Sequence, residues 1–215
     1  VSFVLPTLSQ QWQLTPAQSG WIVSVAFVGM ALGAVASGWA ADRFGRRNVF
    51  VGTMVLYSIA TGLCALSPSL PILVFCRFWV GFGLGGQLPV AVSLVSEFAP
   101  PAVRGRLIVL LESFWGLGWL AAALASWGFI PHFGWHSAFW IGALPIFYAL
   151  WVWRKLPESV PYLLARGRVD EAHALVSRLE ARAGLPVVTE AVVAATATHE
   201  PIRFGQLWKP PFARR

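Results

Sequence analysis

The sequence predicts an all-α integral membrane protein whose helices cross the bilayer side by side. Hydrophobic residues make up 57% of the 215 residues and charged residues only 12%, which is far from the balance of an ordinary soluble domain. Apolar runs, two of them interrupted by one charged residue (Arg77 and Glu112), reach the roughly 20 residues that a helix needs to span a bilayer core of about 30 Å. Of the 16 Lys and Arg, all but Arg77 lie outside these runs.

Six membrane spans are expected in order along the chain. Residues 1–8 are interpreted as the end of a truncated first span that begins upstream. The other spans are expected at about residues 18–41, 48–66, 70–96, 107–127 and 135–153. At the start of the second span, Thr15 supplies a capping hydroxyl, Pro16 suits the first helical position and the Gln18 side chain can reach back to the cap.

The connections between the spans alternate in charge. The connections without Lys, Arg, Asp or Glu are residues 9–17, 67–69 and 129–134. The basic segments are residues 43–47, 104–106 and the chain from residue 154 onward. Because positively charged loops face the cytoplasm, the basic segments are expected on the cytoplasmic side of the inner (plasma) membrane. The net charge of +7 follows from this rule, and no nucleic-acid partner is expected.

The chain becomes more polar after the sixth span. Residues 168–183 predict an amphipathic helix with two acidic residues in its first turn and arginines near its end. A short helix capped by Thr189 and an approach to a further span at residues 210–215 are also expected. Residues 156–215 are therefore interpreted as a cytoplasmic linker.

The stretch GWAADRFGRR, residues 38–47, lies in the short loop between the second and third spans. It resembles the signature of the major facilitator superfamily of transporters, a Gly with Asp-Arg four residues later and then Gly-Arg-Arg. In physical terms, Gly38 would allow close helix approach, Gly45 a tight turn, and Asp42 could face an arginine or a helix N-terminus.

Three further stretches resemble the sugar-porter branch of that superfamily. They are RFWVGFGLGG at residues 77–86, EFAPPAVRG at residues 97–105 and PESVPYLL at residues 157–164. The last stretch departs from the sugar-porter pattern at Val160 and Pro161. This departure favours relatives that carry small organic metabolites.

The resemblance implies an architecture and a gate. Residues 1–155 would form the six-span N-terminal bundle of a twelve-span fold, and the linker would lead to a C-terminal bundle. The expected cytoplasmic gate consists of Gly38, Asp42, Arg43, Gly45, Arg46, Arg47, Glu97 and Arg104.

The segment LLESFWGLGW, residues 110–119, most resembles bacterial niacin-type transporters and related metabolite:proton symporters. It places Glu112 where sugar porters keep a substrate-binding Gln. Helical spacing aligns this residue with Trp115, Gly116, Trp119 and Ala123, so an acid and two indoles could form a wall for a flat aromatic substrate. Gln87, Glu112, Trp115 and Trp119 are the expected substrate-binding residues.

The charges inside the spans are functional candidates, because a charged side chain in a bilayer costs about 2.5 kcal/mol or more. We expect Arg77 and Glu112 to couple transport to protons. Arg77 would pair with an acid on the first span, upstream of Val1, and the pair would break on protonation. Two alternatives remain open: Arg77 extending to the membrane surface, and Glu112 pairing with Arg106.

Gly81, Gly83 and Gly86 match the dinucleotide-binding pattern, but they lie within a span, so helix packing is the better interpretation. Gly81 and Gly85 are expected in close contact with another helix, and Gly29 and Gly33 repeat this spacing. No cofactor, metal site or enzyme activity is expected.

The expected function is secondary active transport, by alternating access, of an aromatic or organic acid such as nicotinate, with protons, the lipid bilayer and the protein's own C-terminal bundle as partners. Alternatives are a sugar or organic-cation transporter, a drug exporter, or a non-transporting membrane sensor.

Overall fold

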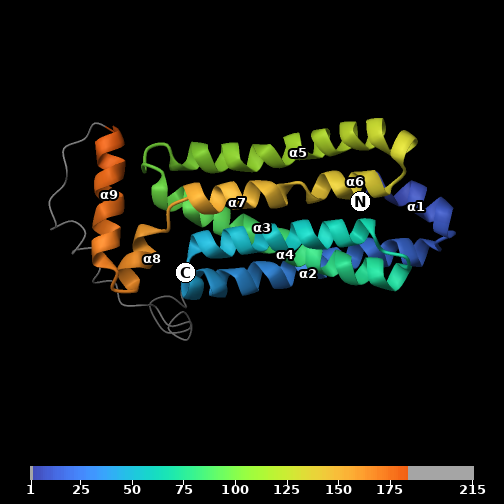
Figure 1. The fold of residues 1–215 in the computed structure, drawn as a ribbon, viewed down its shortest axis with the longest axis horizontal. Coiled ribbons are helices and arrows are strands. Elements are labelled where there is room, and N and C mark those ends of the chain that lie inside the picture. The colour runs from blue at the N-terminus through green and yellow to red at the C-terminus, as the bar shows by residue number, and fades with distance from the viewer. Residues whose placement is uncertain (1, 184–215) are drawn as a thin grey trace, which may run out of the picture. The chain divides into compact units, whose positions relative to one another are not determined.

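The computed structural model describes residues 2–183, and the regular structure in this range is entirely helical (Figure 1). The first of two compact units, Val1–Ser159, contains α1 (Leu5–Trp12), α2 (Pro16–Phe44), α3 (Arg46–Ala65), α4 (Leu70–Phe98), α5 (Arg104–Phe133), α6 (His136–Ala143) and α7 (Pro145–Lys155). The second unit, Val160–Arg215, contains α8 (Val160–Ala165) and α9 (Val169–Ala183). Residues 184–215, with the helix expected after Thr189 and the approach to a further span, lie outside the described residues.

Five helical segments are long and apolar enough to cross a membrane. They are α2, α3, α4, α5 and the segment His136–Lys155, which comprises α6 and α7. These helices run lengthwise beside one another in the first unit (Figure 1). The predicted all-α class is therefore confirmed for the described part of the chain.

The boundaries depart most from the expected spans at three places. The first helix extends to Trp12, beyond the expected end at residue 8. The fifth continues to Phe133, because its end is set by Gly134, which has a φ of 72° and donates its N–H to the Ile130 carbonyl. The sixth span is two helices, since Pro145 has no N–H to donate to the preceding turn.

The start of α2 is the predicted capping box. The Gln18 N–H donates to Thr15 Oγ1 at 3.3 Å, and the Thr15 N–H donates to Gln18 Oε1 at 2.9 Å. Two of the N–H groups that a helix start leaves without intrahelical partners are thereby satisfied.

Glycines bring α2 and α4 into backbone contact. A Cβ added at Gly29 or Gly33 would overlap the Phe78 or Phe82 carbonyl, and one added at Gly81 or Gly85 would overlap backbone atoms of α2. The predicted packing role of these glycines is confirmed. The contact holds α2 and α4 at a separation that larger residues would prevent.

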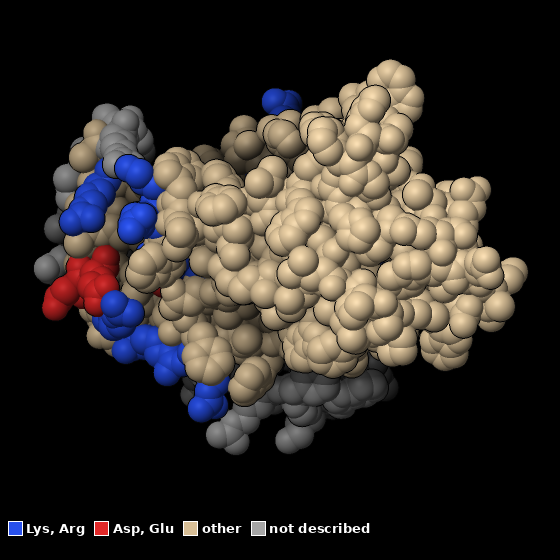
Figure 2. Space-filling model, turned by 45° about the vertical axis from the view of Figure 1, so that its right-hand side comes forward, with Lys and Arg blue, Asp and Glu red and all other residues tan. Residues whose placement is uncertain are grey.

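Buried apolar side chains gather at both ends of the first unit. At the end formed by residues 13–15, 66–69 and 134–135, here called the uncharged end, the core contains Leu8, Cys64, Leu73, Trp135 and Phe139, among others. At the opposite, charged end a smaller cluster contains Ala41, Val90 and Leu94. A broad face without charged side chains separates these ends (Figure 2), as a lipid-facing surface requires.

In the second unit, α8 and α9 pack on each other. Ala172 is fully buried, and Arg168 pairs with Glu171 at 2.6 Å in the first turn of α9. This helix occupies nearly the range expected for the amphipathic helix at residues 168–183.

Candidate functional site

A cavity of about 890 Å³ opens between α2, α3, α4 and α5, with Ser2 and Phe3 also in its wall. Its volume lies in the range typical of small-molecule sites. The structure brings together around it every residue expected to bind substrate or to couple protons: Arg77, Gln87, Glu112, Trp115 and Trp119.

The charged residues of the cavity lie at different depths. Arg77 is seven residues from the start of α4 at the uncharged end, or about 10 Å at 1.5 Å per residue. Glu112 is eight residues from the start of α5 at the charged end, or about 12 Å. Gln87 is ten residues beyond Arg77 on α4 and therefore lies about 15 Å closer to the charged end.

Arg77 is buried, with only 6% of its surface exposed. Its guanidinium lies over the Phe139 ring, 5.4 Å from the ring centroid. Within residues 2–183, Nε and Nη1 are buried and have no hydrogen-bond partner. The side chain therefore does not extend to the membrane surface, and the acid expected upstream of Val1 lies outside the described residues.

Glu112 is exposed on the cavity side of α5. It forms no ion pair with Arg106 in the described part of the chain, so that alternative is not supported. Beyond it, Trp115 and Trp119 are about half exposed. The Trp119 and Phe3 rings pack edge to face, with their centroids 5.9 Å apart.

The cavity-lining face of α5 differs from the predicted stripe. Gly118 and Ala122 line the cavity, whereas Gly116 and Ala123, which were expected there, do not. Successive side chains along a helix are rotated by about 100° about the helix axis. Spacing alone could therefore group these residues, but it could not show which edge of the stripe faces α2 and α4.

Sequence reasoning did not identify Tyr57, which lines the same cavity from α3. A Cβ added at Gly83 would lie 2.8 Å from the Tyr57 Cβ, so glycine at this position makes room for the tyrosine against α4. The signal was Gly83, the second glycine of the cluster in α4, but its partner on another helix cannot be read from one sequence.

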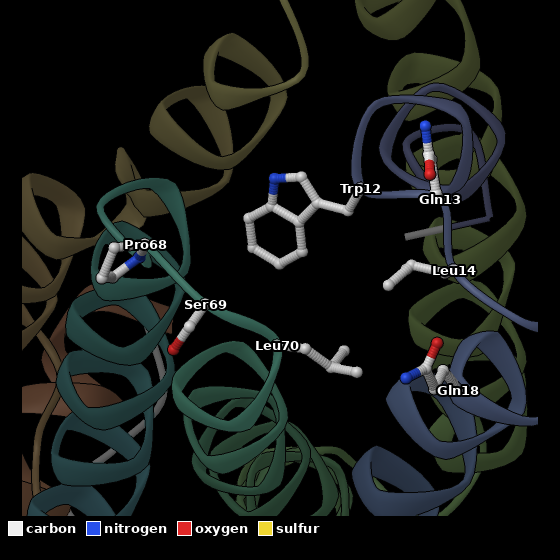
Figure 3. A pocket seen from close by; sticks show the side chains of 7 residues that line it. All are labelled: Trp12, Gln13, Leu14, Gln18, Pro68, Ser69 and Leu70. Atoms are coloured by element: carbon white, nitrogen blue, oxygen red, sulfur yellow. The ribbon is translucent and has the colours of Figure 1, made fainter.

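A second cavity, of about 410 Å³, lies at the uncharged end between the α1–α2 and α3–α4 connections (Figure 3). The Trp12 ring points into it from α1, the Leu70 side chain points toward it from the start of α4, and Ser69 also lines it. None of the predicted site residues lines this cavity.

At the charged end, Arg46 contacts two acids. Its Nη2 lies 3.0 Å from Asp42 Oδ1, and its Nε lies 3.2 Å from Glu97 Oε1. Ser93 also donates its hydroxyl to Glu97. The tight turn predicted at Gly45 is present, with a φ of 95°, and it brings the end of α2 and the start of α3 together.

Arg47 connects the start of α3 to the end of α7. Its backbone N–H donates to Glu158 Oε1 at 3.1 Å, and its Nη2 donates to the Trp153 carbonyl. The guanidinium also lies 5.7 Å from the centroid of the Trp153 ring. The two arginines of the loop therefore join different pairs of helices.

Three other residues of the expected gate lie apart from these contacts. Arg43 lies over the rings of Trp39 and Phe44 on its own helix. Arg104 is exposed at the start of α5 and forms no ion pair within residues 2–183. The close approach expected at Gly38 is absent among the described residues, since a Cβ there would meet no atom within 4 Å. The close contacts lie deeper, at Gly29 and Gly33.

Comparison with known proteins identifies the family. A family profile described as "Sugar (and other) transporter" matches residues 2–212. The chain belongs to this transporter family. Over 215 residues it is 60% identical to the niacin transporter NiaP of Acinetobacter baylyi, a match that covers 100% of this chain and 49% of that protein. Over 162 residues it is 50% identical to a putative niacin/nicotinamide transporter of Bacillus subtilis, covering 75% of this chain and 40% of that protein.

This member of the sugar (and other) transporter family also resembles solved structures. Its fold matches the major facilitator superfamily proton:xylose symporter XylE with a TM-score of 0.71 at 19% identity, covering 91% of this chain and 47% of that one. The likeness confirms the predicted fold, and the chain is part of a multi-pass membrane protein. It spans about half the length of the curated relatives it matches.

Proposed function

We propose that the protein is a secondary transporter of a small aromatic acid such as nicotinate, coupled to protons. The observation that carries this proposal is the cavity between α2, α3, α4 and α5, whose wall combines indole and phenyl rings with the carboxyl group of Glu112. Flat aromatic ligands stack on such rings. The similarity to relatives named for niacin supports the same substrate class.

The proposed mechanism is alternating access in the bacterial inner membrane. The charged end of the bundle and the linker would face the cytoplasm, since basic segments favour that side. Residues 1–155 would form the N-terminal bundle, which rocks against a second bundle around the substrate. The ion pairs of Arg46 with Asp42 and Glu97 would close the cytoplasmic side and break when it opens.

Proton coupling is proposed for the two charged residues of the cavity. Glu112 faces the cavity without an ion-pair partner among residues 2–183, and its carboxyl is the proposed proton carrier. Among residues 2–183, Arg77 is the only arginine or lysine that lines the cavity. A change in the charge of a carboxylate facing it would alter their attraction and so link protonation to binding.

Uptake of labelled nicotinate by cells expressing the full-length protein tests the proposal. Uptake is expected to fall to background with a protonophore and with Glu112→Gln, while Asp170→Asn, which removes an exposed carboxyl on α9, should leave it unchanged. Labelled xylose and choline serve as a sugar and an organic cation. Transport of either of these without nicotinate, by protein shown to reach the membrane, would contradict the substrate assignment.

A further inference from the structure

We propose that Cys64 and Cys76 form an oxidisable thiol pair. A small two-electron oxidant, such as hydrogen peroxide, converts the two thiols into a disulfide that joins α3 to α4. These residues are the two cysteines of the sequence, and neither lines the cavity of about 890 Å³. The pair is therefore a modification site separate from the proposed transport site.

The short connection between α3 and α4 brings the two thiols into contact. Cys64 lies in the last turn of α3, and Cys76 lies in the second turn of α4. Both are buried in the same apolar cluster at the uncharged end, and a side-chain hydrogen bond joins their thiols. Both are free thiols in the structure. A disulfide requires two cysteines held close together, and this contact provides that proximity.

The backbone around Cys64 is held in place by the turn that follows it. The buried Ser67 hydroxyl donates to the Cys64 carbonyl at 2.7 Å, and the Ser67 N–H donates to the same carbonyl at 3.4 Å. Cys76 lies within the continuous helix α4. The two thiols therefore meet between two ordered segments, α3 with its following turn and α4.

The two cysteines differ in access, which sets the order of the reaction. Cys76 retains 6% of its surface exposed, whereas Cys64 has none. Leu73 and Trp135 belong to the same buried cluster. Because oxidation of a thiol depends on exposure, a small uncharged oxidant is expected to react first at Cys76, and Cys64 is the second, resolving thiol.

The oxidation consists of two balanced steps. The Cys76 sulfur attacks one oxygen of hydrogen peroxide, so that an S–O bond forms, the O–O bond breaks, and the other oxygen leaves with the thiol proton as water. The Cys64 sulfur then attacks the Cys76 sulfur; an S–S bond forms, the S–O bond breaks, and the hydroxyl leaves with the Cys64 proton as a second water. The two thiols lose two electrons and the peroxide is reduced to two waters.

Burial and contact act on different steps of this reaction. Burial slows the first step, because the thiolate is the reactive form and apolar surroundings disfavour it. Contact favours the second step, since the attacking sulfur is already beside the oxidised one. Oxidation of the pair is therefore expected to stop at the disulfide and not to continue to sulfinic acid.

Mass spectrometry of the purified full-length protein tests the pair without any substitution. The protein is treated with hydrogen peroxide and unfolded, the remaining thiols are alkylated, and the protein is digested. The expected product is a pair of peptides joined through Cys64 and Cys76, two hydrogens lighter than their sum and separated by a reductant. The Tm of the oxidised protein should rise by about 2 °C or more, and that of peroxide-treated Cys64→Ala should not.

The single variants test the order of reaction. In Cys64→Ala, Cys76 should form a sulfenic acid that dimedone captures, whereas in Cys76→Ala, Cys64 should remain a thiol. Equal dimedone labelling of the two variants would overturn the assigned order. A wild-type digest in which both cysteines remain thiols, or in which either is joined to another cysteine, would overturn the pair. Transport plays no part in these measurements, so failure of the proposed function would be seen separately, in the uptake experiment.

Discussion

Nε of Arg46 lies 3.2 Å from Oε1 of Glu97, so the first residue of α3 is joined to the last turn of α4. The same arginine lies 3.0 Å from Asp42, one turn earlier in the chain. The two acids differ in exposure: the Glu97 side chain is 16% exposed and that of Asp42 75%. One guanidinium therefore offers a direct comparison of a shielded and an exposed ion pair.

Glu97→Gln is expected to destabilise the full-length protein more than Asp42→Asn. Loss of the shielded carboxylate should cost about 1–3 kcal/mol, whereas loss of the exposed one should cost less than about 1 kcal/mol. Thermal unfolding at low and high salt measures both. Equal destabilisation by the two substitutions would show that shielding does not decide the strength of this contact.

Gly33→Leu is expected to disrupt the contact between α2 and α4. A Cβ at this position would overlap backbone atoms of Phe82, so the helices must separate, at a cost of about 1–3 kcal/mol or more from overpacking. Gly52→Leu is the matched control, because a Cβ there would meet no atom within 4 Å. The monodisperse fraction in size-exclusion chromatography and the Tm report the effect, and a normal profile for Gly33→Leu would contradict the packing role.

Trp119→Ala is expected to weaken binding of an aromatic acid about threefold to tenfold, since aromatic ring pairs contribute about 0.5–1.5 kcal/mol. Trp119 lines the cavity, whereas Trp127, two turns further along α5, is 79% exposed and does not. Trp127→Ala should leave the Kd unchanged. If the two substitutions weaken binding equally, the effect comes from α5 as a whole and not from the cavity wall.

Much of the fold could be predicted because its signals are local. The five later spans follow from apolar runs of membrane length, and the capping box at Thr15 needs only three neighbouring residues. The sixth span was expected as one segment, and Pro145, which lacks a backbone N–H, divides it into two helices. The extension of α5 to Phe133 was missed, because Pro131 does not end that helix and Gly134 does.

The site was predictable in its residue types and less so in its geometry. Arg77 and Glu112 stand out in the sequence as charges within apolar runs. Their different depths in the cavity follow only once the bounds of α4 and α5 are known. The place of Tyr57 in the cavity wall and the contact of Arg47 with Glu158 could not be predicted, because each brings together residues that are far apart in the chain.

The sequence by itself determined the helical membrane class, the charged and uncharged ends and the glycines that allow α2 and α4 to touch. These properties depend on composition and on spacing along one helix, both of which are local. The tertiary structure alone decided which face of α5 lines the cavity, that Arg77 is buried beneath Phe139, and that Gly38 meets no neighbour among the described residues. Each of these depends on how one helix is rotated against another, and many side chains from distant segments fix that rotation together.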